Sequence, residues 1–150
     1  IHRVGKFLDD YIKAGSDIIT FHYEIDENIN DIIDRIKQEK IKAGIAIKPK
    51  TSWEKIKDYL HSVDQVIIMT VEPGFGGQSF LSDQIKKIKN ISHYIKKNNL
   101  NVDIEIDGGV NFETGKLCVE AGANILVAGS FLFKQSSLTI ATNKLNDFFN

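Results

Sequence analysis

Residues 66–80 read VIIMTVEPGFGGQSF, and this stretch decides how the chain folds. Its first six residues are apolar or β-branched and predict a buried strand. The strand pattern stops at Pro73, glycines follow, and a helical pattern begins near Leu81. A strand that ends in a glycine-rich loop before a helix is a common way to present backbone N–H groups to an anion. The alternative, that the glycines only form a turn, fits the same residues.

Two later segments repeat this arrangement. Residues 102–110 read VDIEIDGGV and residues 124–130 read NILVAGS, so each apolar run ends in glycine and a polar residue. Helical segments separate these strands from one another. Parallel α/β proteins build their sites at the carboxyl ends of such strands. The sequence therefore predicts one site formed by the loops that follow these strands.

The remaining elements follow from hydrophobic spacing and from capping residues. The segment from Thr51 to Glu54 has the spacing of a capping box and predicts a helix that runs to about His61. Gly15 is a plausible C-cap and Asn111 a plausible N-cap. Further helices are predicted over residues 6–14, 27–39 and 81–97, from residue 111, and over 138–149, with further strands over 17–23 and 43–47.

The order of elements is one helix followed by five strand–helix units. The strands are near-continuous apolar runs, which predicts a parallel sheet covered on both faces. A complete TIM (β/α)₈ barrel takes about 250 residues, or roughly 30 for each unit. Residues 1–150 are therefore predicted to form a single partial barrel domain, helix 3 through helix 8, with the N-terminal three strands absent. An open, doubly wound sheet of five strands is the alternative.

A partial barrel has two unpaired edges and an open core, which we expect to be lined by Ile45, Ile47, Ile67 and Ile106. Unpaired edges and uncovered apolar surface favour association. We therefore expect a homo-oligomer.

Composition excludes several classes of partner. The 150 residues carry a net charge of −1 without a basic block, which argues against nucleic acid and anionic membranes. No apolar run approaches the roughly 20 residues of a membrane span, and residues 1–6 lack the apolar core of a signal peptide. The single Cys118 excludes an internal disulfide and fits a reducing compartment. We expect a cytoplasmic protein in which Cys118 is a buried core thiol.

Several motifs together resemble the ribulose-phosphate 3-epimerase family. They are MTVEPGFGGQ at 69–78, IEIDGG at 104–109, VAGS at 127–130, IITFHYE at 18–24 and GIAIKP at 44–49. The resemblance runs in order from about Asp10 onward. It implies a TIM barrel of the ribulose-phosphate-binding type and a divalent metal ion (Zn, Fe, Mn or Co). It also implies interconversion of ribulose 5-phosphate and xylulose 5-phosphate, a sugar-phosphate reaction of the pentose phosphate pathway.

The reaction that the resemblance implies needs particular groups. Epimerisation at C3 removes a proton next to the C2 carbonyl on one face and returns a proton on the other. The enediolate between these steps needs a Lewis acid at its oxygens. The family uses two aspartates, both of which also bind the metal, and Asp107 matches the second. The resemblance thus makes Asp107 a catalytic residue and a metal ligand. On sequence alone Asp107 can equally be a turn former before Gly108.

The resemblance also assigns residues to the substrate and its phosphate. Met69 matches a thioether placed beside the reacting carbons, although filling of the core explains it equally well. Gln78 belongs to the motif without an assigned contact. The substrate- and phosphate-binding residues expected in this way are Met69, Gly74, Phe75, Gly76, Gly77, Gly108, Gly109, Gly129 and Ser130.

The chain also departs from the family pattern. A serine of the first strand, a His-x-Asp of the second and a metal-binding histidine of the third have no counterpart in it. Three of four expected metal ligands and one of two catalytic carboxylates are therefore missing. His2 falls after the third-strand motif, and His22 matches a histidine that is not a ligand. His61 and His93 lie on helical segments and are expected at the surface.

These departures leave alternatives open. We expect the 150-residue chain alone to be inactive. The alternatives to ribulose-phosphate epimerisation are a 3-epimerase of hexulose 6-phosphates of the allulose type and an inactive fragment that binds phosphate.

Overall fold

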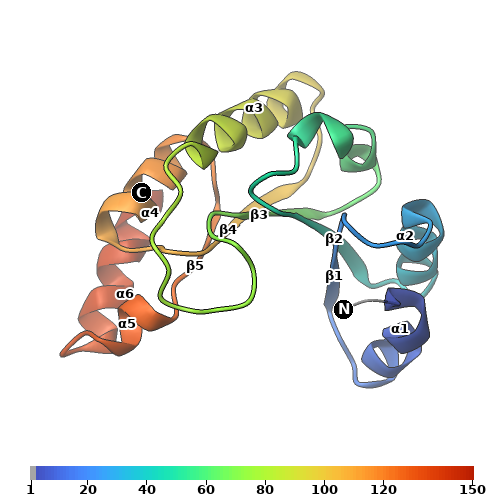
Figure 1. Ribbon diagram of the computed structural model, residues 1–150, viewed down its shortest axis with the longest axis horizontal. Helices are drawn as coiled ribbons and strands as arrows, with labels where there is room; N and C mark the ends of the chain where they lie inside the picture. Colours follow the sequence, from blue (N-terminus) through green and yellow to red (C-terminus); the bar gives the residue numbers. More distant parts are fainter. Residues whose placement is uncertain (1–2) are drawn as a thin grey trace.

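A five-stranded parallel sheet forms the centre of the protein, in the strand order β1-β2-β3-β4-β5 (Figure 1). The computed structural model describes residues 3–150. Each strand pairs with the next one along the chain, as sequential β/α units require. The strands are β1 Ile18–His22, β2 Lys42–Ile47, β3 Gln65–Met69, β4 Asp103–Asp107 and β5 Ile125–Val127.

The helices lie along the outer side of the curved sheet (Figure 1). A doubly wound sheet would reverse its strand order and carry helices on both faces. The sequential order and the single helical layer are instead those of a barrel wall, so the predicted partial barrel is confirmed and the open alternative is wrong. The helices are α1 Val4–Lys13, α2 Ile29–Gln38, α3 Gln84–Lys97, α4 Phe112–Glu120, α5 Ser130–Phe133 and α6 Leu138–Asn146.

Capping residues set several helix boundaries. Beyond α1, Gly15 adopts a φ of +83°, as the predicted C-cap requires. Asn28 accepts a hydrogen bond from the Asn30 N–H at the start of α2. Asn111 and Thr114 form a reciprocal capping box at the start of α4, which confirms the predicted N-cap.

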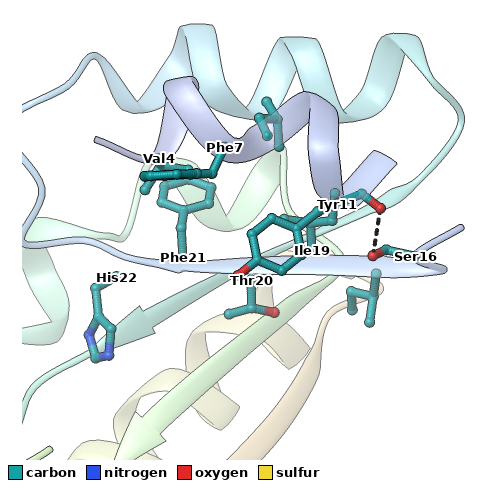
Figure 2. Close-up of a pocket in the computed structure, with 10 residues that line it drawn as sticks. Val4, Phe7, Tyr11, Ser16, Ile19, Thr20, Phe21 and His22 are labelled. Carbon is teal, nitrogen blue, oxygen red and sulfur yellow. Dashed lines mark hydrogen bonds between the residues drawn. The ribbon is translucent and has the colours of Figure 1, made fainter. Parts of the chain in front are cut away.

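The core lies between the sheet and the helices. Register places Ile45 beside Val66 and Val66 beside Ile104, so these side chains share the helix-covered face. Figure 2 shows the alternation on β1, where Phe21 points toward α1 while Thr20 and His22 point to the opposite side. The fully buried residues of this face include Ile45, Ile47, Val66, Ile68 and Ile106, each 0% exposed. The predicted open core is therefore wrong for Ile45, Ile47 and Ile106, because these residues face helices. Ile67 does lie on the opposite face, in register with Glu105.

The opposite face of the sheet is more polar than predicted. Thr20 Oγ1 donates to Gln65 Oε1 over 3.4 Å, and Gln65 Nε2 donates to the Glu105 carboxylate. Gly44 stands between Thr20 and Gln65 in the register of the strands. A Cβ at Gly44 would lie 2.2 Å from Thr20 Oγ1. Only glycine therefore fits at this position in the polar row of Thr20, Gly44, Gln65 and Glu105. The prediction of a sheet covered on both faces is wrong, since the helices cover one face.

The segment 51–61 does not form the predicted helix. It contains two short 3₁₀ helices, Trp53–Lys55 and Tyr59–His61. Ser52 makes no capping hydrogen bond because its hydroxyl instead donates to the Glu54 carboxylate. At the other end of the chain, α5 was not predicted, and the last predicted helix ends at Asn146 before a 3₁₀ turn over Asp147–Phe149.

Two expectations from composition can be compared with the structure. Cys118 is 0% exposed, and burial raises the pKa of its thiol to about 12, which confirms a core residue. Within residues 3–150, no helix has both the length and the apolar character needed to cross a membrane.

The Gly44 site yields a prediction about stability. We expect Gly44→Ala to lower the free energy of unfolding by about 1–3 kcal/mol, because a methyl group would overpack the row beside Thr20. In a Thr20→Ala background the same change is expected to cost much less, since the crowded hydroxyl is gone. Urea denaturation of the four proteins measures this coupling. Equal costs in the two backgrounds would contradict the packing assigned to Gly44.

Candidate functional site

A cavity of about 380 Å³ lies at the carboxyl ends of β3, β4 and β5. Its walls are the loop between β3 and α3, the turn between β4 and α4, and the start of α5. The cavity brings together every site residue predicted from the sequence: Met69, Gly74, Phe75, Gly76, Gly77, Asp107, Gly108, Gly109, Gly129 and Ser130. The structure thus places these residues in one site, while their individual roles stay predictions.

Asp107 is the last residue of β4 and pairs in register with Met69. Its side chain is on the face opposite the helices. Burial raises the pKa of the Asp107 carboxyl, and the charge of His22 at the end of β1 opposes this rise. A half-buried carboxylate with a raised pKa in a cleft is a candidate for proton transfer, because it accepts a proton more readily than a solvated one.

Glu105 is a second carboxylate of this face that the sequence analysis did not single out. It lies two residues before Asp107 on β4 and accepts a hydrogen bond from Gln65. Burial raises the pKa of Glu105, the charge of Asp107 raises it further, and the hydrogen bond from Gln65 opposes both effects. The period-two pattern of residues 103–107 was the available signal, because alternate strand residues share a face.

The glycine-rich loop has a backbone that needs glycine. Gly74 and Gly77 have φ values of +134° and +76°, in the region that other residues rarely adopt. Gln78 fixes the loop, since its Nε2 donates to the carbonyls of Glu72 over 2.7 Å and Phe75 over 2.8 Å. Within residues 3–150, the N–H groups of Gly74 and Gly77 donate no backbone hydrogen bond.

The turn after Asp107 packs directly against this loop. A Cβ on Gly108 would lie 2.5 Å from Val71 Cγ2, and one on Gly109 would lie 2.7 Å from the backbone nitrogen of Phe80. Both glycines also have positive φ values, +124° and +65°. The turn can therefore approach the loop this closely only with glycine at both positions.

A hydrogen-bonded group at the end of β1 was also missed by the sequence analysis. Glu24 accepts hydrogen bonds from the Lys48 N–H over 2.9 Å and from the Thr51 hydroxyl, and it contacts His22 Nδ1 at 3.2 Å. Burial raises the pKa of Glu24, but hydrogen bonds from Thr51, the Lys48 N–H and His22 outweigh it, so the pKa is lowered overall. Glu24 thereby joins the end of β1 to the loop that follows β2.

The described residues do not complete a metal site. Asp107 supplies one carboxylate, and nowhere in residues 3–150 do three His, Cys, Asp or Glu side chains lie close enough together to hold a metal ion. His2 lies outside the described residues. His61 and His93 are exposed, as predicted, and His61 Nε2 is 3.0 Å from the Tyr94 hydroxyl. The metal dependence implied by the resemblance stays a prediction.

A second cavity, of about 230 Å³, lies between α1 and the outer edge of β1 (Figure 2). Its lining is mainly apolar, with side chains such as Phe7, Leu8 and Phe21, and it contains no carboxylate. His22 lies at its margin, but neither Asp107 nor a glycine-rich loop contributes to it. The cavity at β3, β4 and β5 is the candidate site because it contains Asp107 and the glycine-rich loops.

Comparison with known proteins gives a consistent family. The sequence profile of the ribulose-phosphate 3 epimerase family matches residues 1–133. A ribulose-phosphate 3-epimerase from Chlamydia muridarum is 40% identical over 142 residues, which are 93% of this chain and 62% of that protein. One from Bacillus subtilis is 38% identical over 146 residues, 97% of this chain and 67% of that protein. The chain thus spans about two thirds of the length of these relatives.

A chloroplastic ribulose-5-phosphate-3-epimerase from Arabidopsis thaliana is 44% identical over 128 residues, which cover 84% of this chain and 46% of that protein. Among solved structures, a 3-hexulose-6-phosphate synthase superposes with a TM-score of 0.67 at 17% identity, covering 95% of this chain and 66% of that one. This structural likeness shows a shared fold.

The Glu24 group yields a prediction about pH. Its lowered pKa means that the ionised carboxylate stabilises the folded state above its ordinary pKa of 4.5, and that this stability is lost as the pH falls through the lower folded value. We expect Glu24→Gln to lower the free energy of unfolding at pH 7 by about 1–3 kcal/mol, since a charged acceptor is lost. Denaturation from pH 7 to pH 3 should show the difference shrinking below about pH 4.5. A difference that is constant over this range would contradict the assignment.

Proposed function

Because this chain belongs to the ribulose-phosphate 3-epimerase family, we propose that its protein interconverts ribulose 5-phosphate and xylulose 5-phosphate at C3. The observation that carries the proposal is the single cavity in which Asp107 and the glycine-rich loops meet. Its volume of about 380 Å³ falls within the range of sites for small molecules, about 300–1,000 Å³.

In this proposal the Asp107 carboxylate exchanges a proton with C3 on one face of the substrate. Its raised pKa supports this role, because the best general bases have a pKa closer to the working pH than a solvated aspartate has. The resemblance assigns the opposite face to an aspartate that has no counterpart in residues 1–150. Proton transfer at Asp107 is therefore the one chemical step that these residues support, and the 150-residue chain alone is predicted to be inactive.

The phosphate of the substrate would be bound by backbone N–H groups of the loops. The loops after the last two strands are the usual phosphate site of such barrels, and here they contribute Gly109, Gly129 and Ser130 to the cavity. No hydrogen bond in the described chain takes up the N–H of Gly109. Gly77 lines the same cavity, and nothing lies within 4 Å of the position that a Cβ would take there.

Binding of phosphate without turnover is a second candidate function. One observation favours it, namely that the described residues place glycine-rich loops at the cavity but supply one of the two carboxylates that the resemblance implies. Solvent deuterium entering C3 of ribulose 5-phosphate, followed by proton NMR, separates the two functions. Comparing ribulose 5-phosphate with allulose 6-phosphate in the same assay separates pentulose from hexulose specificity.

Association of copies also remains a proposal. Within the described residues, β1 and β5 each pair with one neighbouring strand, so each has a free edge. Free edges can pair with another chain. Light scattering measures the oligomeric state directly, and a compact monomer would contradict the proposal.

We predict that Asp107→Asn abolishes exchange at C3 in the protein as its gene encodes it, with a loss of at least about 10²-fold. The amide keeps the shape of the side chain but cannot act as a base. Asp103→Asn is the matched control, because Asp103 lies on the same face of β4 and contacts Asn124 rather than the cavity. Near wild-type exchange by the Asp107 variant, or an equal loss in both variants, would rule out the role of Asp107.

We predict that Gly77→Val weakens binding of ribulose 5-phosphate much more than binding of ribulose, as measured by calorimetry. A β-branched side chain would occupy the open space at the loop and resist its φ of +76°. Gly15→Val is the matched control for backbone strain, because Gly15 has a φ of +83°, also has nothing within 4 Å of its Cβ position, and lies beyond α1. Equal losses for the two sugars would count against a phosphate role.

A further inference from the structure

Thr70 is a buried polar residue to which neither the sequence motifs nor the proposed reaction assign a role. It follows β3 directly, at the start of the loop that carries the glycines, and it is 0% exposed. A buried hydroxyl is retained at a net cost unless it is hydrogen-bonded, so its partners indicate what it does.

The partners of Thr70 are Asp107 and Gly108, which line the candidate site, and Leu81, at the end of the glycine-rich loop. Its N–H donates to the Asp107 carbonyl over 2.9 Å. Its Oγ1 lies 2.6 Å from the Gly108 carbonyl oxygen and 3.1 Å from that of Asp107. Its own carbonyl accepts a hydrogen bond from the Leu81 N–H over 2.9 Å, at the far end of the glycine-rich loop. One residue thus joins the Asp107 turn to both ends of the loop.

Close packing around these hydrogen bonds restricts movement of the Asp107 turn relative to the glycine-rich loop. On one side Gly108 lies against Val71, and on the other Gly109 lies against the backbone of Phe80, with no room for a Cβ at either glycine. The hydroxyl has a single hydrogen to donate, and the shorter of its two contacts is the one to Gly108. This bond fixes the peptide between Gly108 and Gly109, while the Thr70 N–H fixes the carbonyl of the peptide that immediately follows Asp107.

We propose that Thr70 is a positioning residue that holds the Asp107 carboxylate at a fixed place relative to the glycine-rich loop. The proposal rests on the proposed function, in which Asp107 meets C3 while the loop holds the phosphate. Loss of the hydroxyl would leave the carbonyl of the half-buried Gly108 without this donor, and the turn would relax. A misplacement of about 1 Å at a reacting group can cost about 10²-fold in rate.

The test uses Thr70→Val, which keeps the shape and removes the donor, and Thr70→Ser, which keeps the donor and removes a methyl group. Thr139→Val, an exposed threonine of α6, is the control for the substitution itself. Steady-state kinetics with ribulose 5-phosphate on the protein as its gene encodes it should show kcat reduced by about 10- to 100-fold in Thr70→Val with little change in KM. Thr70→Ser should have a kcat within about threefold of wild type, because it keeps the hydroxyl and loses only the packing of a methyl group.

Thermal unfolding of each variant separates positioning from general stability. Thr70→Ala replaces Thr70→Val if the latter does not fold, and the same rescue by serine is expected. A kcat within twofold of wild type in a folded variant without the hydroxyl overturns the proposal, as does a serine variant that is no more active than the valine variant. Absence of C3 exchange in the wild-type protein would instead contradict the proposed epimerase function.

Discussion

The rest of this structure depends on the burial of one face of the sheet beneath the helices that connect its strands. Ile45, Val66 and Ile106 lie in register on that face and are 0% exposed. Full burial of each such side chain contributes about 1.5–3 kcal/mol relative to exposure. Because the helical connections all lie on this side (Figure 1), the other face is free to carry the polar row from Thr20 to Glu105, and the carboxyl ends of the strands are free to form a cavity.

The sequence was a good guide where structure depends on local chemistry. The strands, their order and the caps at Gly15 and Asn111 follow from hydrophobic runs and short-range hydrogen bonds, and the structure confirms them. The segment 51–61 shows the limit. Ser52 and Glu54 satisfy the pattern of a capping box, yet they bond to each other, and the chain forms 3₁₀ turns. Whether this segment forms an α-helix or 3₁₀ turns depends on tertiary packing, which cannot be read from the spacing of residues in the sequence.

Some residues of the candidate site could also be predicted from the sequence, and others could not. The motifs that resemble the epimerase family identified ten of the residues that line the cavity. Glu24 was missed because its partners Lys48 and Thr51 come from another loop, 24 and 27 residues away. Thr70 was missed because a threonine at the end of a strand fits β-propensity alone. Glu105 could have been found, since strand alternation places it with Asp107.

The two ends of the polar face respond to pH in opposite directions. Glu24 has a lowered pKa, so its ionisation stabilises the folded state, and this stability is lost in acid. Asp107 and Glu105 have raised pKa values, chiefly through burial, so their ionisation destabilises the folded state as the pH rises through those values. β4 carries Asp103, Glu105 and Asp107 on this face, so three carboxylates lie along one half-buried strand. Carboxylates with perturbed pKa values in a cleft are candidates for function, which supports the choice of the Asp107 cavity as the candidate site.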